Sequence, residues 1–72
     1  MSVPRLTPRQ IEILDLLVTG MKNKEIALTL GLTANTTKNY IGTIFDITGM
    51  STRLELALYW IHFRSEILQS GK

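Results

Sequence analysis

Cysteine is absent from the 72 residues of the chain, so disulfide bonds and thiolate ligands for a metal are excluded. A single histidine, His62, cannot form a metal site alone, and we expect no metal and no other cofactor. No apolar run approaches the roughly 20 residues that span a bilayer, and the first ten residues lack the apolar segment of a secretory signal. We therefore expect a cytoplasmic protein that makes no contact with a membrane.

Charged residues are also few, and neither sign dominates. Eight Lys and Arg against six Asp and Glu give a formal charge of +2, which permits a nucleic acid partner without requiring one. One histidine and no cysteine leave no nucleophile–base set to assemble with the acidic residues, so we predict that the protein is not an enzyme. Apolar residues make up 44% of the chain, which is ordinary for a globular protein.

The length fits one domain over residues 1–72. A chain of this size buries roughly 60% of the surface that it exposes when unfolded, so its core is small. Without disulfides or metals, oligomerisation is the usual remaining support for such a core.

Local signals predict two helices in the first part of the chain. Thr7 and Gln10 have the spacing of a capping box, and apolar residues then recur at helical spacing over 8–19. Asn23 has a side chain typical of a helix cap, and we expect a short second helix over 24–30. A glycine follows each of these segments and favours helix termination there.

Two longer helices follow. Thr33 is a cap residue and Gly49 can terminate a helix, which predicts a third helix over 34–48. Thr52 and the glutamate three residues later repeat the capping-box spacing, and the fourth helix extends to about residue 68. No strand pattern competes. The expected fold class is all-α: a four-helix helix-turn-helix domain with a three-helix core and a C-terminal dimerisation helix.

The third helix has one stripe that faces the protein and one polar face. Ile41 and Ile44 lie on the inward stripe, and Thr37 and Thr48 are in register with them. The opposite side is free to contact another molecule. Its residues are Asn35, Lys38, Asn39, Gly42 and Asp46.

The fourth helix carries two apolar stripes, although a three-helix core needs only one. The second stripe is excess apolar surface and needs a partner. We favour a dimer interface for it over the alternative that Trp60 folds back onto the first helix. The first stripe comprises Leu54, Ala57, Leu58, Ile61 and Leu68, and the second comprises Leu56, Trp60, Phe63 and Ile67.

Many positions match one known family in order and spacing. They are Leu6-Thr7-Pro8-Arg9-Gln10, Ile13-Leu14, Gly20, Asn23-Lys24-Glu25-Ile26-Ala27, Leu30-Gly31-Leu32-Thr33, Thr36-x-Lys38-x-Tyr40, Ile44-Phe45, Gly49 and Arg53-x-Glu55-x-Ala57. On these residues, which cover about 6–63, the chain resembles the LuxR/GerE-type helix-turn-helix domain of bacterial transcription regulators.

The resemblance implies a sequence-specific transcription regulator that binds double-stranded DNA as a homodimer. The third helix would lie in the major groove, and the fourth helix would make the dimer contact. Base contacts are expected on the outward face of the third helix, where Lys can donate to guanine and Asn can pair with adenine. The candidates for base contact are Lys38, Asn39, Asn35 and Thr43, and those for phosphate contact are Lys22, Asn23, Lys24, Thr33, Thr36, Tyr40 and Arg53.

Some of these residues also have a structural interpretation. Thr33 caps the third helix, the ring of Tyr40 can be partly core, and Arg53 can brace the corner between the third and fourth helices. The chain also departs from the family pattern. The family often has Lys where Ile47 stands, so Lys38 is the one basic residue left on the third helix.

The low charge of the third helix motivates a second function from another class. In this alternative the domain is a protein-interaction module that binds a partner regulator or RNA polymerase through the fourth helix, with weak or no DNA binding. A sigma-factor region 4 module is a third alternative, although the long apolar fourth helix favours the LuxR/GerE type. The chain is expected to be either a stand-alone regulator or the output domain of a larger one.

Overall fold

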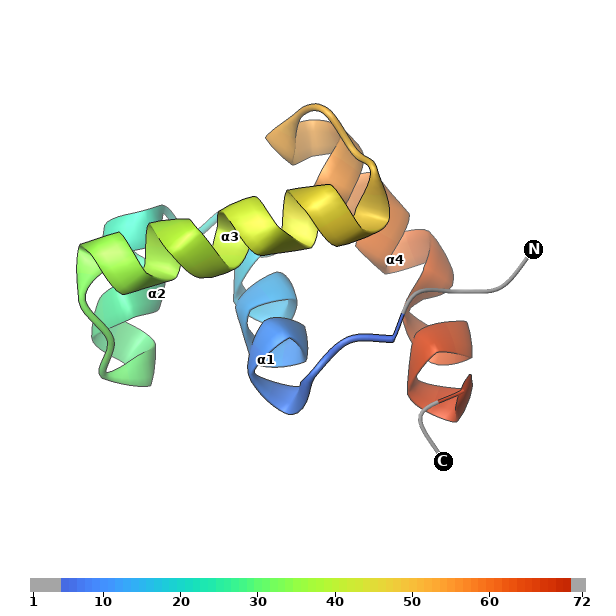
Figure 1. Cartoon of the computed structure of the whole chain (residues 1–72), viewed down its shortest axis with the longest axis horizontal. Helices are drawn as coiled ribbons and strands as arrows, with labels where there is room; N and C mark the ends of the chain where they lie inside the picture. The colour runs from blue at the N-terminus through green and yellow to red at the C-terminus, as the bar shows by residue number, and fades with distance from the viewer. Residues whose placement is uncertain (1–4, 71–72) are drawn as a thin grey trace.

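The structure is a computed structural model that describes residues 5–70 of the chain. It contains four helices in this range and no strand, which confirms the all-α, four-helix fold class. Helix α3 runs along the long axis of the molecule, with α2 against one half of it and α4 crossing its other end, while α1 lies beneath (Figure 1). The helices are α1 (Pro8–Leu17), α2 (Asn23–Leu30), α3 (Ala34–Thr48) and α4 (Arg53–Ser70).

The capping box expected at the start of α1 is present. The Thr7 hydroxyl accepts a hydrogen bond from the backbone N–H of Gln10 at 3.2 Å, and the Gln10 side-chain oxygen accepts one from the N–H of Thr7 at 2.8 Å. The helix ends at Leu17, two residues earlier than predicted. Its C-terminal turn is closed by Gly20, which has a φ of 94° and donates its N–H to the Leu17 carbonyl.

The prediction that Asn23 caps α2 is wrong by one residue. Lys22 is the cap residue, and Asn23 is the first residue of the helix. The Lys22 side chain makes no capping bond, and instead the Glu25 carboxylate accepts from the backbone N–H of Lys22 at 2.9 Å. Because Glu25 supplies the acceptor at this end, the amide of Asn23 is free for another contact.

Helix α3 has the predicted bounds because both of its end signals are used. Thr33 accepts from the N–H of Thr36 at 3.0 Å, and the helix stops at Gly49, which has a φ of 74°. The two threonines on the inward stripe are satisfied within the helix: Thr37 donates to the Thr33 carbonyl at 3.0 Å and Thr48 to the Ile44 carbonyl at 2.8 Å. Neither hydroxyl is therefore left unpaired, and among the described residues no buried side-chain nitrogen or oxygen lacks a hydrogen-bond partner.

One hydrophobic core joins the helices. It takes one stripe from each helix, together with the residue that precedes the capping box of α1. Its buried members are Leu6, Ile13, Leu14, Leu17, Ile26, Ile41, Ile44, Leu56, Trp60 and Ile67.

The assignment of the two stripes of α4 was wrong, because the structure reverses them. Leu56, Trp60 and Ile67, which were predicted to form a dimer interface, are 0%, 0% and 4% exposed within this chain. Phe63 is partly buried and packs against the same core. The stripe expected in the core is instead at the surface: its exposed residues are Leu54 (70%), Leu58 (58%), Ile61 (65%) and Leu68 (40%).

A polar contact accompanies the burial of the second stripe. The indole N–H of Trp60 donates to a carboxylate oxygen of Asp15 on α1 at 2.8 Å. Arg64, one turn further along α4, donates to both oxygens of the same carboxylate at 2.8 and 3.1 Å. The Arg64 guanidinium also lies 5.9 Å from the centre of the Trp60 ring. This contact satisfies a buried indole and ties α4 to α1.

The bonds to Arg64 hold the pKa of Asp15 below its ordinary value of 3.8, against a smaller opposing effect of burial. Since the folded-state pKa is depressed, the ionised carboxylate stabilises the fold above the pKa of the unfolded chain. This stabilisation is lost as the pH falls through the lower, folded-state pKa.

We therefore expect Asp15→Asn to lower the free energy of unfolding by about 1 kcal/mol at pH 7, since the amide keeps an acceptor for Trp60 but loses the ion pair. Urea unfolding of both proteins between pH 7 and pH 2 should show the difference shrinking once Asp15 is protonated. Glu12→Gln is a matched control, because Glu12 pairs with Arg9 only at the surface. A difference that stays constant with pH would contradict the role of the ionised carboxylate.

Candidate nucleic-acid interface

The outward face of α3 is set by the residues on its inward stripe. Thr37, Ile41 and Ile44 are buried in the domain, so the opposite side of the same helix must face solvent. Figure 1 shows this helix lying across the front of the molecule. The exposed side chains on this face include the four candidates for base contact, Asn35, Lys38, Asn39 and Thr43, as well as Asp46 and Ile47.

Three of these side chains are uncommitted. In the part of the chain that the structure describes, Asn35, Lys38 and Asn39 make no side-chain hydrogen bond or ion pair. Thr43 differs, because its hydroxyl donates to the Asn39 carbonyl one turn earlier at 3.1 Å. The outward face of α3 therefore presents two free amides, one free ammonium group and the methyl group of a threonine.

A shallow groove lies along one edge of this face, lined by Thr36, Asn39, Tyr40 and Thr43. Tyr40 is half-buried and its ring packs against the core, as its structural interpretation predicted. The hydroxyls of Thr33 and Thr36 are hydrogen-bonded to each other at 2.9 Å beside the free N–H groups that begin α3. Thr33 is thus the helix cap, and Thr36 is its partner.

Gly42 occupies the middle of the outward face, between the two asparagines and Asp46. A Cβ atom built at Gly42 would meet nothing within 4 Å in the described chain, apart from its chain neighbours and the nearby backbone of α3 itself. The fold therefore does not need a glycine here, and no backbone of this chain approaches it closely. The missing side chain leaves space on the outer surface alone.

The start of α2 carries the other candidates. Lys22 and Lys24 are exposed, while Asn23 is partly buried. Arg53, the first residue of α4, donates from Nη1 to the Asn23 side-chain oxygen at 2.7 Å and from Nη2 to the Met21 carbonyl at 2.6 Å. Both terminal nitrogens of Arg53 thus brace the loop before α2.

From the sequence we expect Arg53 either to contact a phosphate or to brace the corner between the third and fourth helices, and neither expectation includes its bonds to Asn23 and Met21. The alternative that Trp60 folds back onto the first helix is confirmed, although the contact of Asp15 with Trp60 and Arg64 was not predicted. For this contact, one signal was available: a buried tryptophan normally needs an acceptor for its indole N–H. Nothing in the sequence paired Arg53 with Asn23, which lies 30 residues away.

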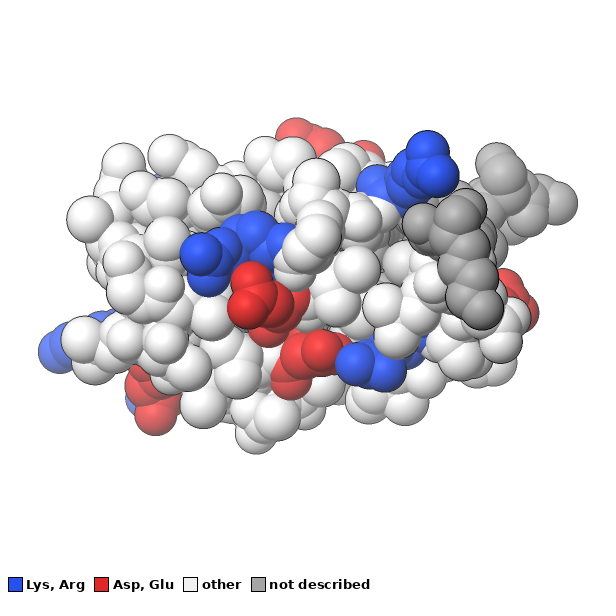
Figure 2. All heavy atoms as spheres, turned by 90° about the horizontal axis from the view of Figure 1, so that it is seen from below, with Lys and Arg blue, Asp and Glu red and all other residues white. Residues whose placement is uncertain are grey.

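Charge is spread thinly over the surface. The view from below shows basic and acidic side chains lying next to one another, with no continuous basic patch on that face (Figure 2). Two of the basic residues are paired with carboxylates, Arg9 with Glu12 and Arg64 with Asp15. Among residues 5–70, the lysines are Lys38 on the outward face of α3 and Lys22 and Lys24 at the start of α2, and none of the three is in an ion pair.

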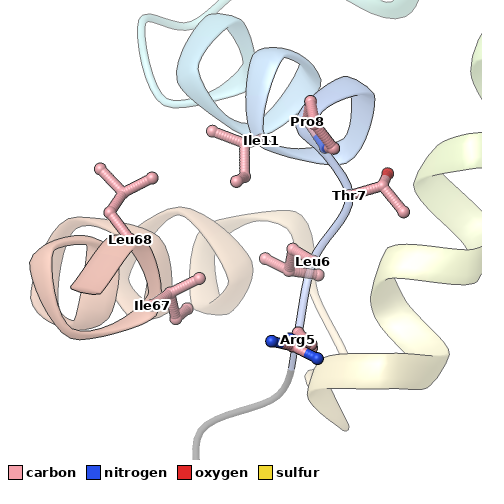
Figure 3. A pocket seen from close by; sticks show the side chains of 7 residues that line it. All are labelled: Arg5, Leu6, Thr7, Pro8, Ile11, Ile67 and Leu68. Carbon is pink, nitrogen blue, oxygen red and sulfur yellow. The ribbon is translucent and has the colours of Figure 1, made fainter. Parts of the chain in front are cut away.

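Other surfaces offer less chemistry. A hollow between the start of α1 and the end of α4 is lined by Leu6, Ile11 and Leu68, among others, and Arg5 is the one ionisable residue among its described lining (Figure 3). Between residues 5 and 70, no group of three His, Asp or Glu residues is placed to hold a metal ion. No helix in this range is both long and apolar enough to cross a membrane.

Most of the chain matches a family of known regulatory proteins. Residues 4–60 match the family model described as bacterial regulatory proteins, luxR family. The chain is 40% identical over 58 residues to a probable transcriptional regulator of Pyropia yezoensis. The aligned residues make up 81% of this chain and 26% of that protein. It is 37% identical over 61 residues to the nitrate/nitrite response regulator protein NarL of Escherichia coli, and these residues make up 85% of this chain and 28% of NarL. The chain thus spans about a quarter of the length of these relatives.

Proposed function

The chain belongs to the luxR family of bacterial regulatory proteins, and we propose that it is a transcription regulator that binds double-stranded DNA sequence-specifically. The observation that carries this proposal is the outward face of α3, where Asn35, Lys38 and Asn39 are exposed and have no partner in the described chain. Such side chains match the donor and acceptor groups on base edges in the major groove. The proposal places the protein in the bacterial cytoplasm.

In the proposed complex, α3 enters the major groove and α2 crosses the backbone, as in other helix-turn-helix proteins. Lys38 and Asn39 read base edges, with Asn35 and Thr43 beside them. Lys22 and Lys24 contact phosphates at the start of α2, and the first N–H groups of α3 offer a further phosphate position. The brace from Arg53 supports this arrangement, because it fixes the loop that carries Lys22.

We further propose that the protein binds DNA as a homodimer through the exposed stripe of α4, which we define as Leu54, Leu58, Ile61 and Leu68. These side chains are 40–70% exposed and lie on one side of a single helix. A second copy would cover them in a self-complementary contact. With one cation on each α3, two half-sites about 34 Å apart would supply the affinity that one copy lacks.

The exposed stripe also supports the second candidate function. The same apolar surface could bind a partner regulator or RNA polymerase while α3 binds DNA weakly or not at all. Salt dependence separates the two functions. A DNA complex should weaken steeply as salt rises, because phosphate contacts release counterions. No DNA binding at low salt, together with a stable protein complex, would favour the interaction module.

Lys38→Ala should weaken binding to a selected DNA site by about 1–3 kcal/mol and relax one base preference, because the ammonium group donates to a base edge. Fluorescence anisotropy on the selected duplex and its single-base variants measures both effects. Lys24→Ala is the contrasting variant: loss of a phosphate contact should weaken all sequences alike and reduce the salt slope by about one. Unchanged affinity and base preference for Lys38→Ala would reject its proposed role.

Leu58→Glu should convert the dimer to a monomer, since a carboxylate would be buried without a partner in the middle of the exposed stripe. Sedimentation equilibrium gives the mass, and circular dichroism checks that the helices remain. Leu28→Glu is the matched control, because Leu28 is 76% exposed on α2, outside the stripe. If the wild-type chain is a monomer at all concentrations, or if Leu58→Glu remains a dimer, the proposed interface is wrong.

A further inference from the structure

The chemical groups on the outward face of α3 restrict which base pairs it can read, provided that the proposed DNA-binding function holds. Helix α3 contains no arginine and one lysine among its 15 residues. Bidentate contact with guanine is made chiefly by arginine or lysine, whereas asparagine pairs with the N6 and N7 groups of adenine. The free side chains are two amides and one ammonium group, so this face offers two groups suited to adenine and one suited to guanine.

Thr43 adds an apolar contact on the same face. Its hydroxyl proton is donated to the Asn39 carbonyl at 3.1 Å, so towards a base the side chain offers its methyl group and an acceptor oxygen. A threonine methyl group suits the C5-methyl group of thymine. Gly42, immediately before it, leaves open space on the same surface, since a Cβ atom there meets nothing within 4 Å. A thymine methyl group would fit against this bare stretch of helix.

The geometry of the helix also limits where the contacts fall. Asn35 and Asn39 are four residues apart on one side of α3, which separates them by about 6 Å along the helix axis. That distance is close to two base-pair steps of about 3.4 Å. Asp46 lies two turns beyond Asn39, and its carboxylate repels phosphate oxygens. Base contacts are therefore concentrated in the N-terminal half of α3.

We propose that each half-site read by α3 consists mainly of A·T pairs, with two adenines about two steps apart and one guanine at the edge contacted by Lys38. Asn35 and Asn39 each hold an adenine through N6 and N7. Thymine methyl groups pack against Gly42 and the methyl group of Thr43.

The test begins with selection of bound duplexes from a random pool by the full chain at low salt. The strongest site is then remade with 7-deazaadenine, which lacks N7, and separately with deoxyuridine, which lacks the thymine methyl group. We expect A·T-rich half-sites, and a loss of about tenfold in affinity for 7-deazaadenine at either of the two adenines. A G·C-rich half-site, or equal binding of the modified duplexes, would overturn the inference.

Asn39→Ala assigns the effect to a residue. The Asn39 side chain is exposed and makes no bond in the described chain, so its removal leaves the fold intact. This variant should bind the unmodified duplex and the duplex modified at its own adenine equally, whereas Gln69→Ala, exposed on α4, should keep the tenfold difference. A tenfold difference that persists in Asn39→Ala contradicts the pairing. A chain that binds no duplex from the pool instead contradicts the DNA-binding function itself, so the two failures are distinguishable.

Discussion

Burial of Trp60 against α1 decides how the whole surface of this domain is divided. Its indole is fully buried and donates to Asp15, and the two bonds from Arg64 hold that carboxylate in its ionised form. Once this face of α4 is fixed in the core, the opposite stripe of Leu54, Leu58 and Ile61 has to face outward. The same contact seats α4 against α1, so Arg53 at its start reaches the loop before α2. The short helix α2 is thereby held in place by Arg53, which lies 30 residues beyond Asn23 in the sequence.

The outward face of α3 follows from a similar constraint. Thr37 and Thr48 stand among aliphatic residues on the inward stripe, yet each hydroxyl donates to a carbonyl within α3. The core therefore tolerates them, and the helix keeps one defined side for a ligand. That side carries two free amides and only one basic residue, Lys38, which is little positive charge for a surface that binds DNA. We propose that the low charge gives one copy a weak affinity for DNA, so that a second copy is needed. The amides then direct specificity mainly to adenine and thymine.

The helices were predictable where their ends carry local chemistry. Thr33 and Gly49 predicted both ends of α3 correctly, because a cap residue and a terminating glycine act on their own backbone neighbours. The buried face of α4 could not be predicted in this way. Two apolar stripes with the same helical periodicity both indicate a helix, but they do not indicate which stripe is buried. The deciding contact, from Trp60 to Asp15, joins residues 45 positions apart. The exposed residues of α3 could be predicted because they follow from local periodicity. The brace between Arg53 and Asn23 could not, because it joins residues that are distant in the sequence.

In the proposed function the outward face of α3 serves DNA and is not required by the fold. Gly42→Leu tests it most directly, because a Cβ atom at this position meets nothing in the chain and leucine is the better helix former by nearly 1 kcal/mol. The measurement is the affinity of the variant for a selected duplex, with its thermal stability alongside. We expect a domain at least as stable as the wild type that binds DNA at least tenfold more weakly. A stable variant that binds DNA as tightly as the wild type would contradict it.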